Sequence, residues 1–226
     1  MKQANIIKIS RSKEDFFRYV NICNNNFRTL TPSIYLYQKI FEKQRKANYQ
    51  VDKLISDREF LKLVYVTLIS WNMNMRGAKM VKSDEFVESI QKFSKNIFQL
   101  NNKELNLPSE VEFEEVLELT KPVFMGLKVM ESKSKIVGVS KTLHFLIPKL
   151  FPPMDRKYTM NFFYGNSHYS KDKNKEFNTF AVLLREFYKI TQKLKLSTKD
   201  VNGVLWNTTV PKLIDNAIIG YISKNT

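Results

Sequence analysis

The chain has 226 residues, enough for one domain or two closely packed lobes with a sizeable core. Lysine and arginine total 37 against 22 aspartate and glutamate residues, and the net charge of +15 indicates a polyanionic partner, usually nucleic acid. Cys23 is the only cysteine, and His144 and His168 lack zinc-ligand spacing, which argues against a disulfide, a four-cysteine iron–sulfur cluster and a zinc site; we expect no metal and no cofactor.

Turn-forming residues are scarce in this chain. Six glycines and seven prolines favour long helices over many short strands. Ser12 is expected to cap the first helix, which runs to Asn25. A second helix opens at Thr31-Pro32-Ser33, with the proline in its first turn. Residues 56–59 have the pattern of a capping box ahead of an apolar helix over residues 60–70.

The second half of the chain continues the helical pattern. Ser83 starts another helix, and the acidic segment from Pro108 is expected to be helical until Pro122 breaks it. Residues 177–194 have helical spacing, and residues 200–222 are predicted to form two short helices divided near Pro211. Because no segment alternates as a strand does, the predicted fold class is all-α.

Charge is spread unevenly along the chain. Residues 101–120 carry six glutamates against Lys103 alone, whereas residues 121–160 are basic. This asymmetry implies that a polyanion approaches from one side. No apolar run approaches ~18 residues and the N-terminal segment lacks the apolar core of a signal peptide, so we expect no membrane partner and a cytoplasmic, nucleoid-associated location.

One stretch, "GVSKTLHFLIPKLFPPMDRKYTMNFFYG" over residues 138–165, places a lysine and an aspartate at predicted helix starts. Gly138 supplies a turn conformation that other residues resist, and Ser140 can cap the helix that follows. Lys141 then begins that helix, and Asp155 begins the next one. Two such helix ends can face one cleft.

This stretch resembles the signature of the helix-hairpin-helix DNA glycosylases, the superfamily of endonuclease III and 8-oxoguanine DNA glycosylase. In that resemblance, Gly138 matches the hairpin glycine, Lys141 the lysine nucleophile and Asp155 the catalytic aspartate. The chain departs from the family in having "GVSK" where "GVGxK" is usual, in its shorter interval between lysine and aspartate, and in lacking the iron–sulfur cysteines of endonuclease III.

A second segment, "LISWNMNMRGAKM" over residues 68–80, is similar to the family's "LLSAQ"-type helix end. That helix end supplies a polar residue that fills the gap left by an extruded base. Asn72 occupies the matching place, and Asn74 is a second candidate.

The resemblance implies an all-α fold of two helical lobes with a helix-hairpin-helix motif and a cleft between them. We expect residues 56–150 to form a central lobe including the hairpin, and residues 1–55 and 151–226 to form the second. The implied function is base-excision repair: a monomer acting on double-stranded DNA would remove a damaged base, such as the oxidised purine 8-oxoguanine, and cleave the abasic site through a Schiff base on Lys141.

The expected contacts to DNA follow from the same resemblance. Backbone amides around Gly138 and Ser140 would hold phosphates, together with the side chains of Lys133, Lys135 and Arg76. The flipped base would stack on one of four aromatic residues, Trp71, Phe145, Tyr158 or Phe162.

Two other interpretations stay open on the sequence. A non-catalytic helical DNA-binding protein would use the hairpin for phosphate contacts, with Lys141 a solvated lysine and Asp155 a plain helix cap. Alternatively, the richness in lysine, asparagine and isoleucine reflects an AT-rich genome, and the chain is an interaction protein that does not bind DNA.

Overall fold

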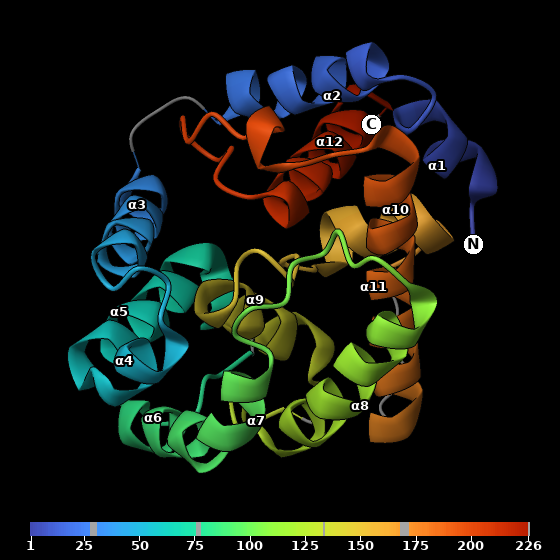
Figure 1. Ribbon diagram of the computed structural model, residues 1–226. Coiled ribbons are helices and arrows are strands. Elements are labelled where there is room, and N and C mark those ends of the chain that lie inside the picture. Colours follow the sequence, from blue (N-terminus) through green and yellow to red (C-terminus); the bar gives the residue numbers. More distant parts are fainter. Residues whose placement is uncertain (28–30, 76–77, 133, 168–171, 226) are drawn as a thin grey trace.

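The computed structural model describes residues 1–27, 31–75, 78–132, 134–167 and 172–225. Within these residues the chain forms twelve α-helices and no strand, and the only strand-like contact is an isolated bridge between Met80 and Met130 (Figure 1). The predicted all-α class is therefore confirmed. The helices are α1 (Gln3–Ile9), α2 (Lys13–Asn26), α3 (Pro32–Lys46), α4 (Val51–Ser56), α5 (Arg58–Leu68), α6 (Ser83–Lys92), α7 (Ser94–Gln99), α8 (Glu110–Gly126), α9 (Ile136–Leu146), α10 (Asn161–Tyr164), α11 (Lys173–Leu194) and α12 (Val210–Asn225).

Three short segments have other helical geometry. The segments η1 (Ile69–Met73) and η2 (Arg156–Met160) are π-helical, and η3 (Thr198–Asp200) is a 3₁₀ turn. η1 continues directly from α5, and η2 leads directly into α10.

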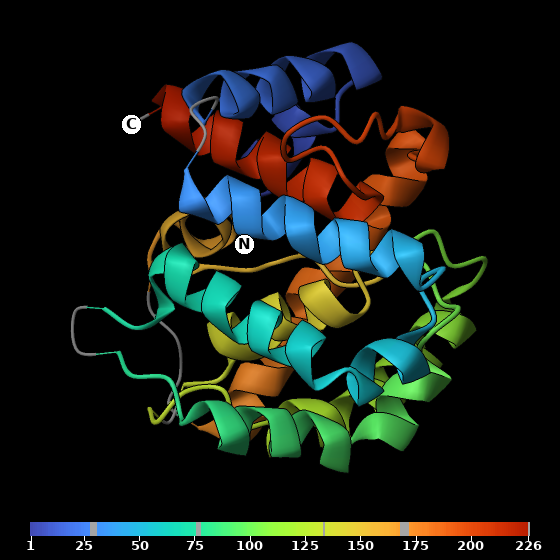
Figure 2. The ribbon, with the colours of Figure 1, turned by 90° about the vertical axis from the view of Figure 1, so that its left-hand side faces the viewer.

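The first and last long helices pack along each other, α12 against α2. Figure 2 shows α2, α12, α3 and α5 one below another. Gly220 lies where α12 meets α2, and a Cβ atom added to it would come within 2.0 Å of the backbone oxygen of Tyr19. Only glycine therefore allows this close approach of the two helices.

Helix α9 lies in the centre of the molecule. All of its residues are buried except Val137 and Lys141, which are partly exposed. A helix that is apolar on all sides belongs in a core, and α9 accordingly packs against α4, α5 and α11. One continuous apolar cluster extends from Ile6 to Tyr221 and includes elements of both expected lobes, whose boundaries stay a prediction.

Helix starts largely agree with the sequence. Ser12 Oγ accepts from the backbone N–H of Asp15, and Thr31 Oγ1 accepts from that of Ile34. The expected capping box at residues 56–59 is wrong in one respect, because Asp57 is the cap of α5. Its Oδ1 accepts from the two backbone N–H groups of Glu59 and Phe60, at 2.9 and 3.0 Å.

Both predicted proline breaks are wrong. Pro122 lies inside α8, which continues to Gly126 because the following residues Val123 and Phe124 are fully buried in the core. Pro211 lies in the first turn of α12, where a missing N–H costs little, so residues 210–225 form one helix.

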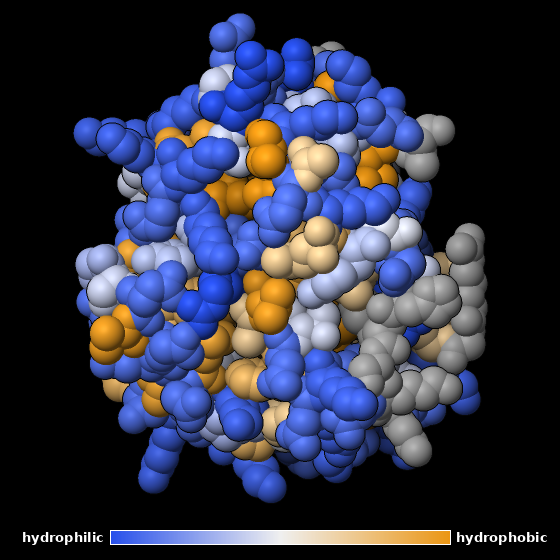
Figure 3. All heavy atoms as spheres, turned by 90° about the vertical axis from the view of Figure 1, so that its right-hand side faces the viewer, coloured by the Kyte–Doolittle hydropathy of each residue, from blue (hydrophilic) through white to orange (hydrophobic). Residues whose placement is uncertain are grey.

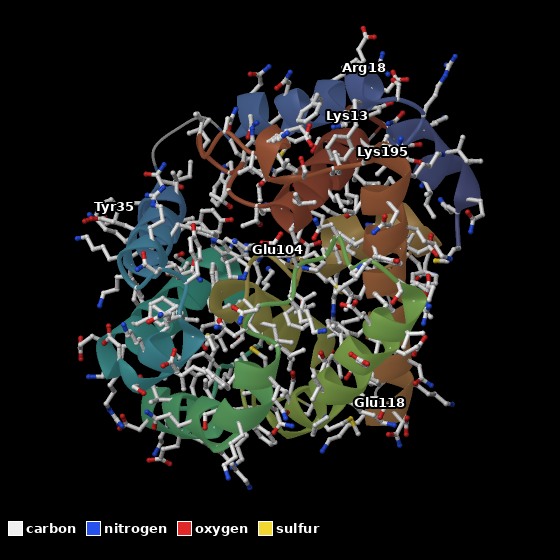
Figure 4. The ribbon with its side chains drawn as sticks, viewed as in Figure 1. Lys13, Arg18, Tyr35, Glu104, Glu118 and Lys195 are labelled. Atoms are coloured by element: carbon white, nitrogen blue, oxygen red, sulfur yellow. The ribbon has the colours of Figure 1, made fainter. Side chains whose placement is uncertain are left out.

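The surface carries many ion pairs and only scattered apolar side chains. Lys13 on α2 pairs with Asp200 at 2.8 Å, and Arg18 pairs with Asp15 at 2.8 Å (Figure 4). The face shown in Figure 3 is mostly hydrophilic, with small separate hydrophobic areas. No helix in the described ranges combines the length and apolarity that crossing a membrane requires.

Candidate functional site

A pocket of about 360 Å³ lies where the ends of α2 and η1 meet α9, the start of η2, and α12. Its lining combines aromatic rings, charged groups and side-chain amides. The aromatic and charged members are Phe27, Trp71, Tyr158, Trp206, Lys141, Asp155, Lys212 and Asp215. A pocket of this size with a few converging polar groups is suited to a small ligand.

Lys141 lies in the interior of α9, and its side chain reaches the pocket. The expectation that Lys141 begins a helix is wrong, since α9 starts at Ile136. Lys141 is only partly exposed, and its ammonium nitrogen lies 5.4 Å from the centre of the Trp71 ring in the pocket. Burial lowers the pKa of Lys141, against the opposing effect of the carboxylates of Asp155 and Asp215.

Asp155 lines the same pocket and caps η2. Its Oδ1 accepts from the backbone N–H groups of Tyr158 and Thr159, at 2.7 and 3.4 Å. Asp155 Oδ2 has no hydrogen bond to any described residue. Asp155 therefore does cap η2, and one of its carboxylate oxygens has no hydrogen-bond partner among the described residues.

Ser140 explains why Lys141 and Asp155 come together. Its hydroxyl accepts from the backbone N–H of Met154 at 3.1 Å, and both residues are fully buried. This bond ties the residue before Lys141 to the residue before Asp155. Ser140 lies inside α9 and does not cap it, and its buried hydroxyl holds the returning chain against α9.

Gly138 also has a different role from the expected hairpin glycine. It is buried in the first turn of α9, where an added Cβ would lie 3.1 Å from the side chain of Val129 and 3.2 Å from that of Met130. The chain turns earlier, in the segment between α8 and α9. Neither the tight turn at Gly138 nor an exposed amide for a phosphate is present. Lys135 is also occupied, because its ammonium donates to the backbone oxygen of Leu127 at 2.7 Å.

The π-helical segments η1 and η2 both border the pocket. Asn72, in η1, lines it with a left-handed backbone at φ 60° and ψ 27°. Asparagine tolerates this conformation better than most residues, and both π-helical turns and strained residues are frequent at functional sites. Asn74 lies outside the pocket lining, and its Oδ1 accepts from the backbone N–H of Met80 at 3.0 Å. Arg76 and Lys133 lie outside the described residues.

Two of the four aromatic residues expected to stack on a flipped base line the pocket, and two do not. Trp71 and Tyr158 line the pocket, whereas Phe145 and Phe162 are fully buried away from it. Phe145 packs against Trp71 with ring centroids 4.9 Å apart, so it supports the pocket wall without being exposed to a ligand. Trp206 also lines the pocket, with its centroid 6.1 Å from that of Trp71.

Sequence reasoning missed the contribution of α12. Lys212 donates to Asp215 at 2.5 Å and to Asn216 at 2.8 Å, and all three side chains are buried. Burial raises the pKa of Asp215, although the neighbouring Lys212 opposes the shift. A lysine and an aspartate three positions apart on an apolar helix are the signal that could have identified this pair, because such residues are almost never buried unless paired.

A buried polar chain supports the pocket from behind. Burial lowers the pKa of His144 to about 3, so its imidazole is neutral. Since a backbone oxygen can only accept, His144 Nδ1 donates to Phe151 O at 2.9 Å, and Nε2 accepts from the Tyr37 hydroxyl at 3.1 Å. Tyr37 in turn stacks on Trp71, with ring centroids 5.6 Å apart.

No protein-family model, curated protein or solved structure matches this chain. The resemblance to the helix-hairpin-helix glycosylases therefore rests on the two sequence motifs. Among the described residues, no group of three or more histidine, cysteine, aspartate or glutamate side chains could hold a metal ion.

Proposed function

We propose that this protein is a DNA glycosylase that excises a damaged base, with Lys141 as the nucleophile and Asp155 as the carboxylate that stabilises the transition state. The observation that carries this proposal is that Lys141 and Asp155 line one pocket together with Trp71, Asn72 and Tyr158. The sequence resemblance had already paired these residues with glycosylase roles.

The chemistry requires a neutral amine next to a negative charge. Lys141 would attack C1′ of the sugar with its lone pair, while the bond from C1′ to the base breaks and the base leaves with that electron pair and takes up a proton. Asp155 would stabilise the positive charge that develops on the sugar. Burial favours the neutral amine of Lys141, as a nucleophile requires.

The remaining pocket residues suit the extrusion of a base. A base inside a duplex must be flipped into a pocket, at a cost of about a few kcal/mol. Trp71 or Tyr158 would stack on the flipped base, and Asn72 would fill the gap in the duplex. An oxidised purine such as 8-oxoguanine is the first lesion to test, by resemblance, and opening of the sugar ring on Lys141 would give the Schiff base needed for strand cleavage.

Borohydride trapping tests the proposal. Reduction should link the protein covalently to DNA containing an abasic site, and Lys141→Gln should abolish the link. Lys135→Gln is a matched control, because Lys135 is a half-buried lysine at the start of the same helix whose pKa is also lowered by burial, yet it lies outside the pocket. This control should trap as well as the native protein.

The outcomes separate this proposal from its rivals. Tight duplex binding without an adduct would favour a non-catalytic DNA-binding protein, although the phosphate-binding hairpin expected for that function is not formed at Gly138 and Ser140. Negligible duplex affinity at low salt would favour an interaction protein whose basic charge is compositional. A panel of duplexes, each with one lesion, would identify the substrate on a denaturing gel.

A further inference from the structure

The pocket contains two lysines in contrasting situations. Lys212 is buried and hydrogen-bonded to both Asp215 and Asn216. Lys141 forms no ion pair with a carboxylate of the described residues, and its ammonium nitrogen lies 5.4 Å from the centre of the Trp71 ring. The Lys212 amine is thus held by two hydrogen bonds, whereas the Lys141 amine forms no ion pair that would hinder its reaction.

The contrast is notable because two carboxylates act on Lys141. Asp155 and Asp215 line the same pocket as Lys141, and the negative charge of each raises the pKa of its amine. One carboxylate oxygen of Asp155 accepts the hydrogen bond that caps η2. Asp215 has no such cap, and Lys212 is its ion-pair partner.

We infer that Lys212 is a positioning residue of the pocket: by holding Asp215, it keeps a second carboxylate away from the amine of Lys141. The inference rests on the proposed function, since it treats Lys141 as the reacting amine. Lys212 stabilises this arrangement from α12, and its ammonium nitrogen lies 5.4 Å from the ring centre of Trp206, another wall of the pocket.

The groups that face Lys141 are few. Among the described residues, the titratable groups that line the pocket with Lys141 are Asp155 and Tyr158 at η2, Lys212 and Asp215 on α12, and Cys23 on α2. Burial raises the pKa of the Cys23 thiol to about 12, so this thiol carries no charge near neutral pH. The positive charge of Lys212 lowers the pKa of Lys141, and the negative charge of Asp215 raises it. Removing Lys212 while Asp215 stays ionised therefore raises the pKa of Lys141.

Reductive methylation measures this coupling without DNA. Formaldehyde forms an imine with a neutral amine, releasing water, and cyanoborohydride reduces the imine, so the rate at each lysine follows its neutral fraction. Peptide mass spectrometry would give the pH profile of Lys141 in the intact protein, with Lys135 as the internal reference.

Loss of Lys212 raises the pKa of Asp215 further, so the comparison is made at pH values where Asp215 is ionised. There, Lys212→Met should move the Lys141 profile up by about one pH unit, which is about a tenfold slower reaction at a fixed pH below the midpoint. Lys212→Arg should leave the profile close to native, because the charge on Asp215 keeps its partner. The double variant Lys212→Met with Asp215→Asn should also return the profile close to native, a rescue that a purely structural role for Lys212 would not produce. An unchanged profile in Lys212→Met, or no rescue in the double variant, would overturn the inference.

If Lys212→Met does not fold, Asp215→Asn provides a second test of the inference. It leaves the positive charge of Lys212 beside Lys141 and removes the negative one, so the profile should move to lower pH; an upward shift or no shift would contradict the inference. Circular dichroism would report folding of each variant. Because methylation needs no DNA, failure of this inference is distinct from failure of borohydride trapping, which alone would refute the proposed function.

Discussion

At the scale of single residues, several side chains in this protein serve structure and site at once. Asp155 caps η2 with one oxygen and lines the pocket. Ser140 is buried, and its bond to Met154 places Lys141 beside the returning chain. His144 orients Tyr37, on which Trp71 stacks. A substitution at these positions therefore has to separate the two roles.

Asp155→Asn separates the capping role of Asp155 from the role of its negative charge in the pocket. Asparagine caps helices as well as aspartate does, so the variant should fold with nearly native stability. It cannot supply the negative charge, and base release should slow by about two orders of magnitude or more. Single-turnover cleavage on a lesion-containing duplex, with thermal unfolding alongside, would measure both. Activity that survives with little change would mean that Asp155 is only a cap.

His144 should make the fold sensitive to acid. Its pKa is about 3 in the folded protein, lowered mainly by burial, against an ordinary value of 6.5. Between these values the unfolded chain binds a proton that the folded chain excludes, so the free energy of unfolding should fall as the pH falls below about 6.5, by up to about 1.4 kcal/mol per pH unit. Urea unfolding at pH 6.5 and pH 5 would show the slope.

His144→Gln is the comparison for this slope. It removes the titrating ring and keeps both a donor and an acceptor. The variant should be less stable at pH 7 but should lose about 1–2 kcal/mol less between pH 6.5 and pH 5. Equal slopes in the two proteins would show that other groups cause the acid sensitivity.

At the scale of elements, the pocket depends on how α12 is placed. Lys212 and Asp215 reach the pocket because α12 packs closely along α2, and Gly220 allows a close approach of α12 to the backbone of α2. Helix α9 is held from all sides, so its one pocket-facing lysine has a fixed position. The site is thus built by helices from both ends of the chain.

Gly220→Ala should disturb this packing. The added methyl group would overlap the backbone oxygen of Tyr19, which cannot move without shifting α2. Overpacking of this kind costs about 1–3 kcal/mol, more than the roughly 1 kcal/mol that alanine contributes to a helix. The midpoint of urea unfolding should therefore fall, while Ser223→Ala on the same helix should change it little. A stabilised Gly220→Ala variant would contradict the observed helix contact.

At the scale of the whole molecule, the acidic helix α8 lies away from the start of α3, which borders the pocket. The glutamates of α8 are partly neutralised, since Arg185 pairs with Glu110 and Glu114. Glu118 on α8 and Tyr35 on α3 lie on opposite sides of the molecule (Figure 4), and the pocket is lined by Ser33 at the start of α3. Under the proposed function, we expect a DNA backbone to approach from the side away from these glutamates.

The net charge of +15 should make duplex binding depend on salt. We expect affinity for an undamaged duplex to fall by about tenfold or more between 50 and 200 mM salt, which corresponds to roughly two or more phosphate contacts. Fluorescence anisotropy at several salt concentrations would give the slope. Absence of measurable affinity at 50 mM would indicate that the basic charge arises from composition alone.

Local features of the sequence determined the all-α class and the helix starts at Ser12 and Thr31. They also identified Lys141 and Asp155 as candidate site residues. Caps and helical periodicity act over a few residues, so they can be identified without tertiary context. The two predicted proline breaks failed for the same reason, because burial of the neighbours of Pro122 and the position of Pro211 within its helix are not local properties.

Only the tertiary structure decided what surrounds Lys141. Gly138 and Ser140 proved to be packing residues, and Phe145 a supporting one, because α9 is enclosed by helices distant in sequence. Trp206, Lys212 and Asp215 joined the pocket through the contact of α12 with α2. A sequence can indicate which residues carry reactive groups, but the charges that tune those groups come from whichever helices pack against them.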